Sequence, residues 1–102
     1  MASVEIFKAL SNDTRLKIVD LLKKEKSLCA CKIEEKIDLT QSTISHHMKI
    51  LEKCNIVNCR KEGKWHHYSL NYQTLKSIEL FIKDLIQVQE ENILGGRCSC
   101  DS

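Results

Sequence analysis

This sequence of 102 residues contains no apolar run of the roughly 18 residues that a membrane-spanning helix needs. Its first residues, MASVEIFKALSN, lack the basic and then apolar order of a secretory signal peptide. There is also no internal repeat, low-complexity stretch or internal linker. We therefore expect a single domain with one modest core, located in the cytoplasm.

Catalytic and redox motifs are missing as well. No nucleophile, base and oxyanion-stabilising set can be assembled from these residues, so we do not expect an enzyme. The six cysteines include no Cys-x-x-Cys within a βαβ pattern, which argues against a thiol–disulfide exchange or metal-trafficking protein. In a reducing compartment such cysteines are metal ligands, reactive thiols or core residues rather than disulfides.

What the sequence does have is a basic middle segment. The net charge is only +2, but residues 40–70 contain five basic and two acidic side chains, whereas residues 71–102 contain three and five. Apolar residues make up 42% of the chain, as in an ordinary folded protein. The charge distribution is the one that a DNA-facing surface needs.

Apolar spacing predicts four helices in the first half of the chain. Two of them span residues 4–10 and 13–24, and Asn12 or Asp13 is placed to cap the second. Two more helices follow, the first short and the second longer, separated by residues 38–40, and Thr40 is placed to cap the second. This last pair has the dimensions of a helix-turn-helix.

After residue 55 the apolar period changes from helical to alternating. We predict a β-hairpin that turns at Gly63, with Trp65, Tyr68 and Tyr72 in its core. A long and strongly apolar helix begins near residue 75 and ends at Gly95-Gly96. The apolar side chains of such a helix need another protein surface to pack against.

The second helix of the helix-turn-helix begins with small polar side chains, as a helix that enters the major groove does. Gln41 could pair with an adenine edge, while lysines further along would meet phosphates. The alternative is a polar helix beside a basic loop that is simply a solvated surface. The predicted DNA contacts are Gln41, Ser42, Thr43, Ser45, His46 and Lys49 in the helix and Arg60, Lys61 and Lys64 in the hairpin.

The string LTQSTISHHMKILEKCNIVNCRKEGKWHHYSLN resembles the recognition helix and wing of the arsenic-repressor (ArsR/SmtB) family of bacterial metal-sensing regulators. FKALSNDTRLKIVDLL is similar to that family's opening segment, so the resemblance covers most of residues 5–71. It implies a winged helix-turn-helix, mainly α with a β-hairpin wing and of order ααααββα. It also implies a repressor that binds an inverted-repeat operator in double-stranded DNA as a homodimer, docked through the first and last helices.

Two cysteines stand at the start of the first helix of the helix-turn-helix. Cys29-Ala30-Cys31 resembles the Cys-Val-Cys of the family's arsenic and cadmium sensors. Residues two apart in a regular helix point about 200° away from each other, so both thiols can hold one ion only where the chain is unwound. A helix N-terminus also favours the thiolate, which is the form that binds soft metals. Ion binding should therefore reorient the helix that positions residues 41–49.

A third ligand must come from elsewhere in the chain. The family's arsenic sensors often have another cysteine three residues on, where this sequence has Glu34. As(III) and Sb(III) prefer three soft ligands. The tail after Gly95-Gly96 supplies candidates, although it could also be idle. We thus predict domains 1–94 (DNA binding and dimerisation) and 95–102 (flexible tail), As(III) or Sb(III) as inducer, and metal ligands Cys29, Cys31, Cys98 and Cys100.

Two alternatives keep this fold and change its chemistry. Four thiolates would also suit Cd(II) or Pb(II), and a thiol-redox repressor would instead oxidise its cysteines. The family's zinc ligands on the last helix are absent, because residues 75–92 contain no histidine. We expect Cys54 and Cys59 to be small buried hydrophobes. The adjacent pairs His46-His47 and His66-His67 should be surface or packing residues, since neighbouring side chains do not point to one spot.

Overall fold

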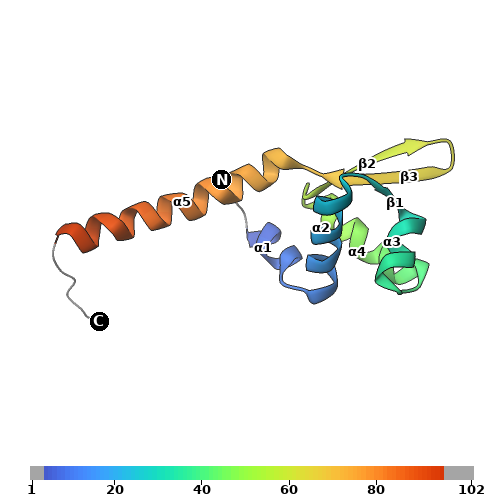
Figure 1. Ribbon diagram of the computed structural model, residues 1–102, viewed down its shortest axis with the longest axis horizontal. Helices are drawn as coiled ribbons and strands as arrows, with labels where there is room; N and C mark the ends of the chain where they lie inside the picture. The colour runs from blue at the N-terminus through green and yellow to red at the C-terminus, as the bar shows by residue number, and fades with distance from the viewer. Residues whose placement is uncertain (1–3, 96–102) are drawn as a thin grey trace.

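The structure is a computed structural model that describes residues 4–95, with the side chains of residues 4–87. Four helices form a body under a small sheet, and a fifth helix runs away from that body (Figure 1). Within the described residues the elements are α1 (Val4–Leu10), α2 (Asp13–Glu25), β1 (Leu28–Cys29), α3 (Ala30–Ile37), α4 (Gln41–Lys53), β2 (Val57–Glu62), β3 (Trp65–Leu70) and α5 (Tyr72–Gly95).

The helices begin where the predicted capping residues stand. The side chain of Asn12 accepts a hydrogen bond of 3.1 Å from the backbone N–H of Arg15, which caps α2. The hydroxyl of Thr40 accepts one of 3.3 Å from the N–H of Thr43, which caps α4. The hairpin turns at Gly63, whose φ of +62° is a conformation that favours glycine. The helix-turn-helix and the hairpin are therefore confirmed.

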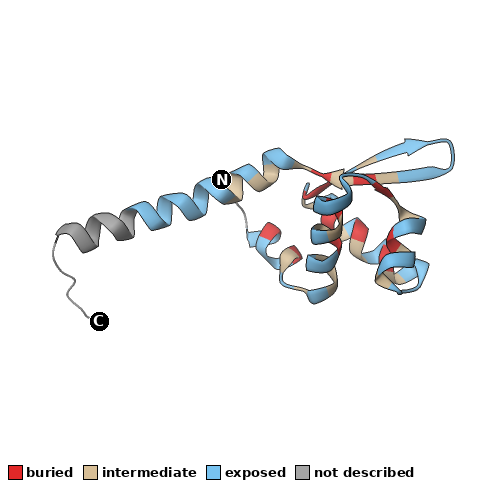
Figure 2. Cartoon of the chain, viewed as in Figure 1, coloured by how far each residue is buried: buried red, intermediate tan, exposed pale blue. Residues whose placement is uncertain are grey.

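The hydrophobic core lies where α2, α3 and α4 meet the inner face of the sheet. Figure 2 shows the buried residues gathered in this body and not along residues 72–87 of α5. The tight apolar packing fixes α4 relative to the hairpin, so that both present defined outer surfaces. The largest fully buried side chains are Ile18, Leu22, Ile33, Ile44, Met48, Leu51, Ile56 and Val57.

The sheet has one strand more than predicted. The order ααααββα omitted β1, which pairs antiparallel with β3 and gives the strand order β1-β3-β2. Two residues are too few to display the alternation by which a strand is recognised in sequence. The omission matters because β1 contains Cys29, so the cysteine pair is attached directly to the wing.

Two of the three aromatic residues assigned to the hairpin core are exposed. Tyr68 is buried, but Trp65 is 53% exposed and Tyr72 is 63% exposed, so that prediction was wrong for both. Successive side chains in a strand point to opposite faces. Tyr68 faces the core and Trp65, three positions earlier on β3, lies on the outer face, while Tyr72 is the first residue of α5.

The last helix is longer than predicted and leaves a large apolar surface uncovered. It begins at Tyr72, and Phe81, Leu85 and Ile86 are 40%, 52% and 53% exposed. The ring of Phe7 in α1 lies 5.8 Å from that of Phe81, so apolar side chains of α1 and α5 adjoin. No helix among the described residues is long and apolar enough to cross a membrane.

Candidate functional site

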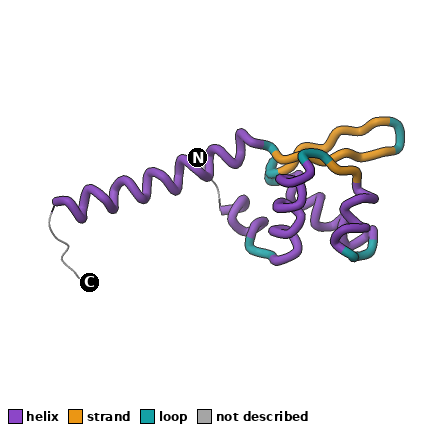
Figure 3. Tube along the Cα trace, in the orientation of Figure 1, coloured by secondary structure: helices purple, strands orange, loops and turns teal. Residues whose placement is uncertain are grey.

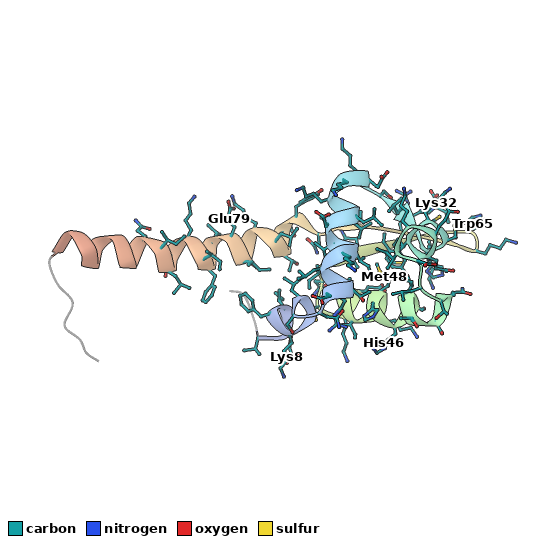
Figure 4. The ribbon with its side chains drawn as sticks, turned by 60° about the horizontal axis from the view of Figure 1, so that its bottom comes forward. Lys8, Lys32, His46, Met48, Trp65 and Glu79 are labelled. Carbon is teal, nitrogen blue, oxygen red and sulfur yellow. The ribbon has the colours of Figure 1, made fainter. Side chains whose placement is uncertain are left out.

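The outer face of α4 presents most of the polar residues predicted to contact DNA. Figure 4 places Met48 on the inner side of α4 and His46 on its outer side. Because the inner face of the helix is buried, the polar face is held outward as a unit. A shallow surface depression of about 420 Å³ is lined by Gln41, Ser42, Ser45, His46 and Lys49.

Thr43 belongs to the helix cap rather than to this face. Its side chain is half-buried and does not line the depression. The hydroxyl of Thr40 donates a hydrogen bond of 2.9 Å to the Thr43 hydroxyl. A DNA contact by Thr43 stays a prediction, but its hydroxyl already has a structural partner.

The hairpin carries the second set of predicted contacts. Arg60, Lys61 and Lys64 are all exposed on or beside its turn. Figure 3 shows that this turn and the loop between α3 and α4 lie at the same end of the molecule, away from α5. The carboxylate of Glu62 lies 3.6 Å from the Arg60 guanidinium, a weak surface pair that water and salt screen. The wing therefore remains available for phosphates.

The two adjacent histidines of α4 have different surroundings. His46 is exposed, whereas His47 is half-buried and its Nδ1 lies 3.1 Å from a terminal nitrogen of Arg15. The same guanidinium donates from Nε to the carbonyl of Ala9, at 2.6 Å. Burial, and next the charge of Arg15, lower the pKa of His47, so at neutral pH its ring is uncharged and accepts this hydrogen bond. Sequence reasoning missed this contact because 32 positions separate the two residues.

The two thiols of the Cys29-Ala30-Cys31 segment converge. Their Sγ atoms are 2.7 Å apart. Cys29 has an extended backbone, with φ −79° and ψ 160°, and is the N-cap of α3, whereas Cys31 lies in the first turn. The backbone is thus extended at Cys29 and becomes helical from Ala30, so the pair does not lie within one regular helix, as its use as an ion site requires. Cys31 is exposed and Cys29 half-buried, so an ion in solution can reach both sulfurs.

The hydrogen bond between the two sulfurs shifts their pKa values in opposite directions. The pKa of Cys29 is lowered, chiefly because the Cys31 thiol hydrogen-bonds to it, and backbone N–H groups at the start of α3 add to this against the effect of burial. The pKa of Cys31 is raised, first by that same hydrogen bond and then by burial and by the neighbouring charge. The pair therefore supplies two soft sulfur donors at one exposed point, of which Cys29 is the more readily ionised, and this fits a thiophilic ion.

Two sulfurs do not complete a coordination shell. Among the described residues, no group of three His, Cys, Asp or Glu side chains is already placed to hold a metal ion. The predicted ligands Cys98 and Cys100 lie outside the described residues, as does the predicted tail from residue 96 onward. That part of the ligand set stays a prediction.

The other two described cysteines, Cys54 and Cys59, are not part of this pair. Cys54 ends α4, and its thiol donates to the carbonyl of Glu5 at 3.6 Å. Cys59 faces Tyr68 across the hairpin, where burial and then Cys59 raise the pKa of Tyr68 to about 12. Both thiols are half-buried at the edge of the core, so they are packing residues but not fully buried ones.

Comparison with known proteins places the chain among bacterial regulators. Residues 12–58 match the family described as bacterial regulatory protein, arsR family. An arsenical resistance operon repressor of Staphylococcus xylosus is 39% identical over 98 residues, which cover 91% of this chain and 92% of that protein. A homolog of a cadmium resistance transcriptional regulatory protein, from Staphylococcus aureus, is 41% identical over 78 residues, covering 76% and 64%.

The fold is also found among solved structures. The crystal structure of an ArsR family transcriptional regulator, RHA00566, superposes with a TM-score of 0.77. The match covers 88% of this chain and 97% of the other, at 18% sequence identity. At that identity the likeness concerns the fold, and it agrees with the winged-helix arrangement described above.

Proposed function

We propose that this chain, which belongs to the arsR family of bacterial regulatory proteins, is an arsenite- or antimonite-responsive repressor. Members of this family are transcriptional regulators and not enzymes. In this proposal a homodimer binds operator DNA through α4 and the wing. The dimer releases the DNA when Cys29, Cys31 and one further thiolate hold As(III) or Sb(III).

The observation that carries the proposal is the 2.7 Å approach of the two sulfurs at the start of α3. Trivalent arsenic and antimony are soft and take three thiolates, so a preformed pair with an exposed side suits them. The name of one relative, an arsenical resistance operon repressor, supports this class of inducer, whereas the name of another, a homolog of a cadmium resistance regulatory protein, supports a divalent ion. Cd(II) or Pb(II) is the second candidate, because divalent soft ions also bind thiolates.

The position of Cys29 supplies a route from the ion site to the DNA-binding surface. Cys29 ends β1, which pairs with β3 of the wing, and it also caps α3, which packs against α4. A change in the backbone of this one residue therefore reaches both elements that face DNA. Such coupling requires that the ion-bound and DNA-bound conformations differ, so that the ion favours one conformation and DNA the other.

The dimer is proposed from the uncovered apolar surface of α1 and α5. An exposed apolar patch of this extent, on a long helix, is typical of a protein–protein interface. A two-fold partner would cover it and would place two copies of α4 in successive major grooves, about 34 Å apart, which corresponds to an inverted-repeat operator.

The third thiolate is assigned to Cys98 or Cys100. Protection from alkylation tests this directly: the reduced full-length protein is treated with a thiol reagent with and without arsenite, and each cysteine is quantified by mass spectrometry. We expect arsenite to protect Cys29, Cys31 and one tail cysteine, and to leave Cys54 and Cys59 unchanged as internal controls. Protection of neither Cys29 nor Cys31 would contradict the proposal, and their joining in a disulfide without arsenite would favour the redox alternative.

A further inference from the structure

The pairing of β1 with β3 places a histidine beside the cysteine pair. Cys29 lies directly opposite His67 in the antiparallel register, and Leu28 lies opposite Tyr68. Opposite residues in such a pair share a face, with Cβ atoms about 4.5–5.5 Å apart. Leu28 and Tyr68 are buried on the inner face, so Cys29 and His67 are neighbours on the outer one.

The imidazole of His67 is already oriented by a carboxylate. Its Nε2 lies 3.4 Å from Oε1 of Glu62, and its side chain is 29% exposed. Histidines that bind metals commonly use one ring nitrogen for the ion and the other for a carboxylate or carbonyl. In His67 the contact with Glu62 uses Nε2, so Nδ1 is the ring nitrogen that would bind an ion.

The neighbouring histidine is directed elsewhere. His66 lies on the inner face of β3, lines a small cavity with Tyr68, and has its Nδ1 3.5 Å from the sulfur of Cys59. His66 thus contacts Cys59, whereas His67 stands opposite Cys29 in the strand register. Adjacent rings on a strand do not converge on one point, but the pairing of β1 with β3 puts Cys29 opposite one of them.

We propose that His67 is a ligand for divalent soft ions at the Cys29–Cys31 site, giving two thiolates and one imidazole before any tail cysteine is added. This rests on the proposed function, in which the cysteine pair holds the ion. Cd(II) and Zn(II) accept mixed sulfur and nitrogen donors, whereas As(III) prefers thiolates alone. His67 therefore distinguishes between the two classes of ion, and rotation of its side chain toward the sulfurs would supply the third donor.

Cadmium affinity tests the assignment. The reduced full-length protein is titrated with Cd(II) in competition with a chelator, following the ultraviolet thiolate-to-cadmium absorption, for the unmodified protein, His67→Ala and His66→Ala. We expect His67→Ala to weaken Cd(II) binding by about 10–100-fold, as loss of a metal site's supporting groups does. His66→Ala is the matched control and should bind as the unmodified protein does. Arsenite affinity should be equal in all three.

A loss of arsenite affinity equal to the loss for Cd(II), or an equal loss in His66→Ala, would overturn the proposal, because it would mean that the substitution merely disturbs β3. No loss in His67→Ala would overturn it too. Nitrogen-15 NMR of the histidine rings gives a second readout, in which Nδ1 of His67 must shift on addition of Cd(II). Cys29→Ser separates the two hypotheses: if it leaves Cd(II) binding unchanged, the thiol site itself is wrong, whatever His67 does.

Discussion

A terminal nitrogen of the Arg15 guanidinium lies 3.1 Å from Nδ1 of His47 and thereby connects α2 to the recognition helix. The same guanidinium donates to the carbonyl of Ala9 at the end of α1. One side chain thus joins the helix proposed for dimerisation to the helix proposed for DNA reading. The contact requires a neutral His47, because a protonated ring has no acceptor nitrogen.

This contact predicts a stability that depends on pH. The pKa of His47 is lowered in the folded chain, first by burial and then by Arg15, so the unfolded chain binds a proton at a higher pH than the folded chain does. The free energy of unfolding should therefore have its full value above about pH 6.5, the ordinary pKa of histidine, and should decrease as the pH drops below that value. Urea unfolding at pH 8 and pH 5 measures the change. His47→Gln should reduce this difference, while His46→Gln on the outer side of α4 should keep most of it; an equal effect of both would contradict the assignment.

The cap of α4 and its neighbouring serine should have separable roles. Thr40→Ala removes the hydroxyl that accepts the N–H of Thr43, so the free energy of unfolding should fall by about 1 kcal/mol. Ser42→Ala removes an exposed hydroxyl on the proposed DNA face and should weaken operator binding with little change in stability. Chemical denaturation and DNA titration of both variants check this. A stability loss in Ser42→Ala as large as that in Thr40→Ala would count against it.

Substitution of a base-reading residue and of a phosphate-contacting residue should affect DNA binding in different ways. Gln41→Ala should cost about 1–3 kcal/mol in operator binding and relax the preference at one base pair, because Gln41 stands at the start of the proposed reading face. Lys64→Ala should weaken binding to all sequences alike and reduce the salt slope by about 1, as the loss of one phosphate contact does. Titrations of operator and random DNA at several salt concentrations measure both. An equal loss of preference for operator over random DNA in the two variants would contradict this prediction.

The apolar side of α5 should determine the oligomeric state. Phe81→Asp places a carboxylate in the surface shared with Phe7 of α1, and we expect it to convert a dimer into monomers. Lys83→Asp is the control, because residues two apart lie about 200° around the helix from each other. Analytical ultracentrifugation distinguishes the states. A dimer that survives Phe81→Asp unchanged would place the interface elsewhere.

The sequence was sufficient wherever one strong local pattern determined the structure. The caps at Asn12 and Thr40 and the turn at Gly63 all depend on nearest neighbours, and all were found as predicted. The DNA-binding and thiol residues were likewise chosen from local spacing and a family resemblance, and their roles stay proposals.

What sequence reasoning missed depends on contacts between distant segments. β1 is a strand only because Leu28 and Cys29 meet β3, nearly 40 positions later. The exposure of Trp65 follows from which face of β3 meets the core, and a six-residue strand with polar side chains on both faces does not reveal this. The Arg15–His47 contact likewise needs the packed helices. Of these, the pairing of β1 with β3 is also what connects the thiol pair to the wing.

The most direct test of the account is the release of DNA by arsenite in the presence of reductant. A labelled inverted-repeat operator is bound by the full-length protein, and its fluorescence anisotropy is followed as arsenite is added, with Cys29→Ser and the packing-site control Cys59→Ser alongside. We expect release in the unmodified protein and in Cys59→Ser, and retention of DNA by Cys29→Ser. Release from Cys29→Ser at the same arsenite concentration would contradict the claim that this thiol pair is the sensor.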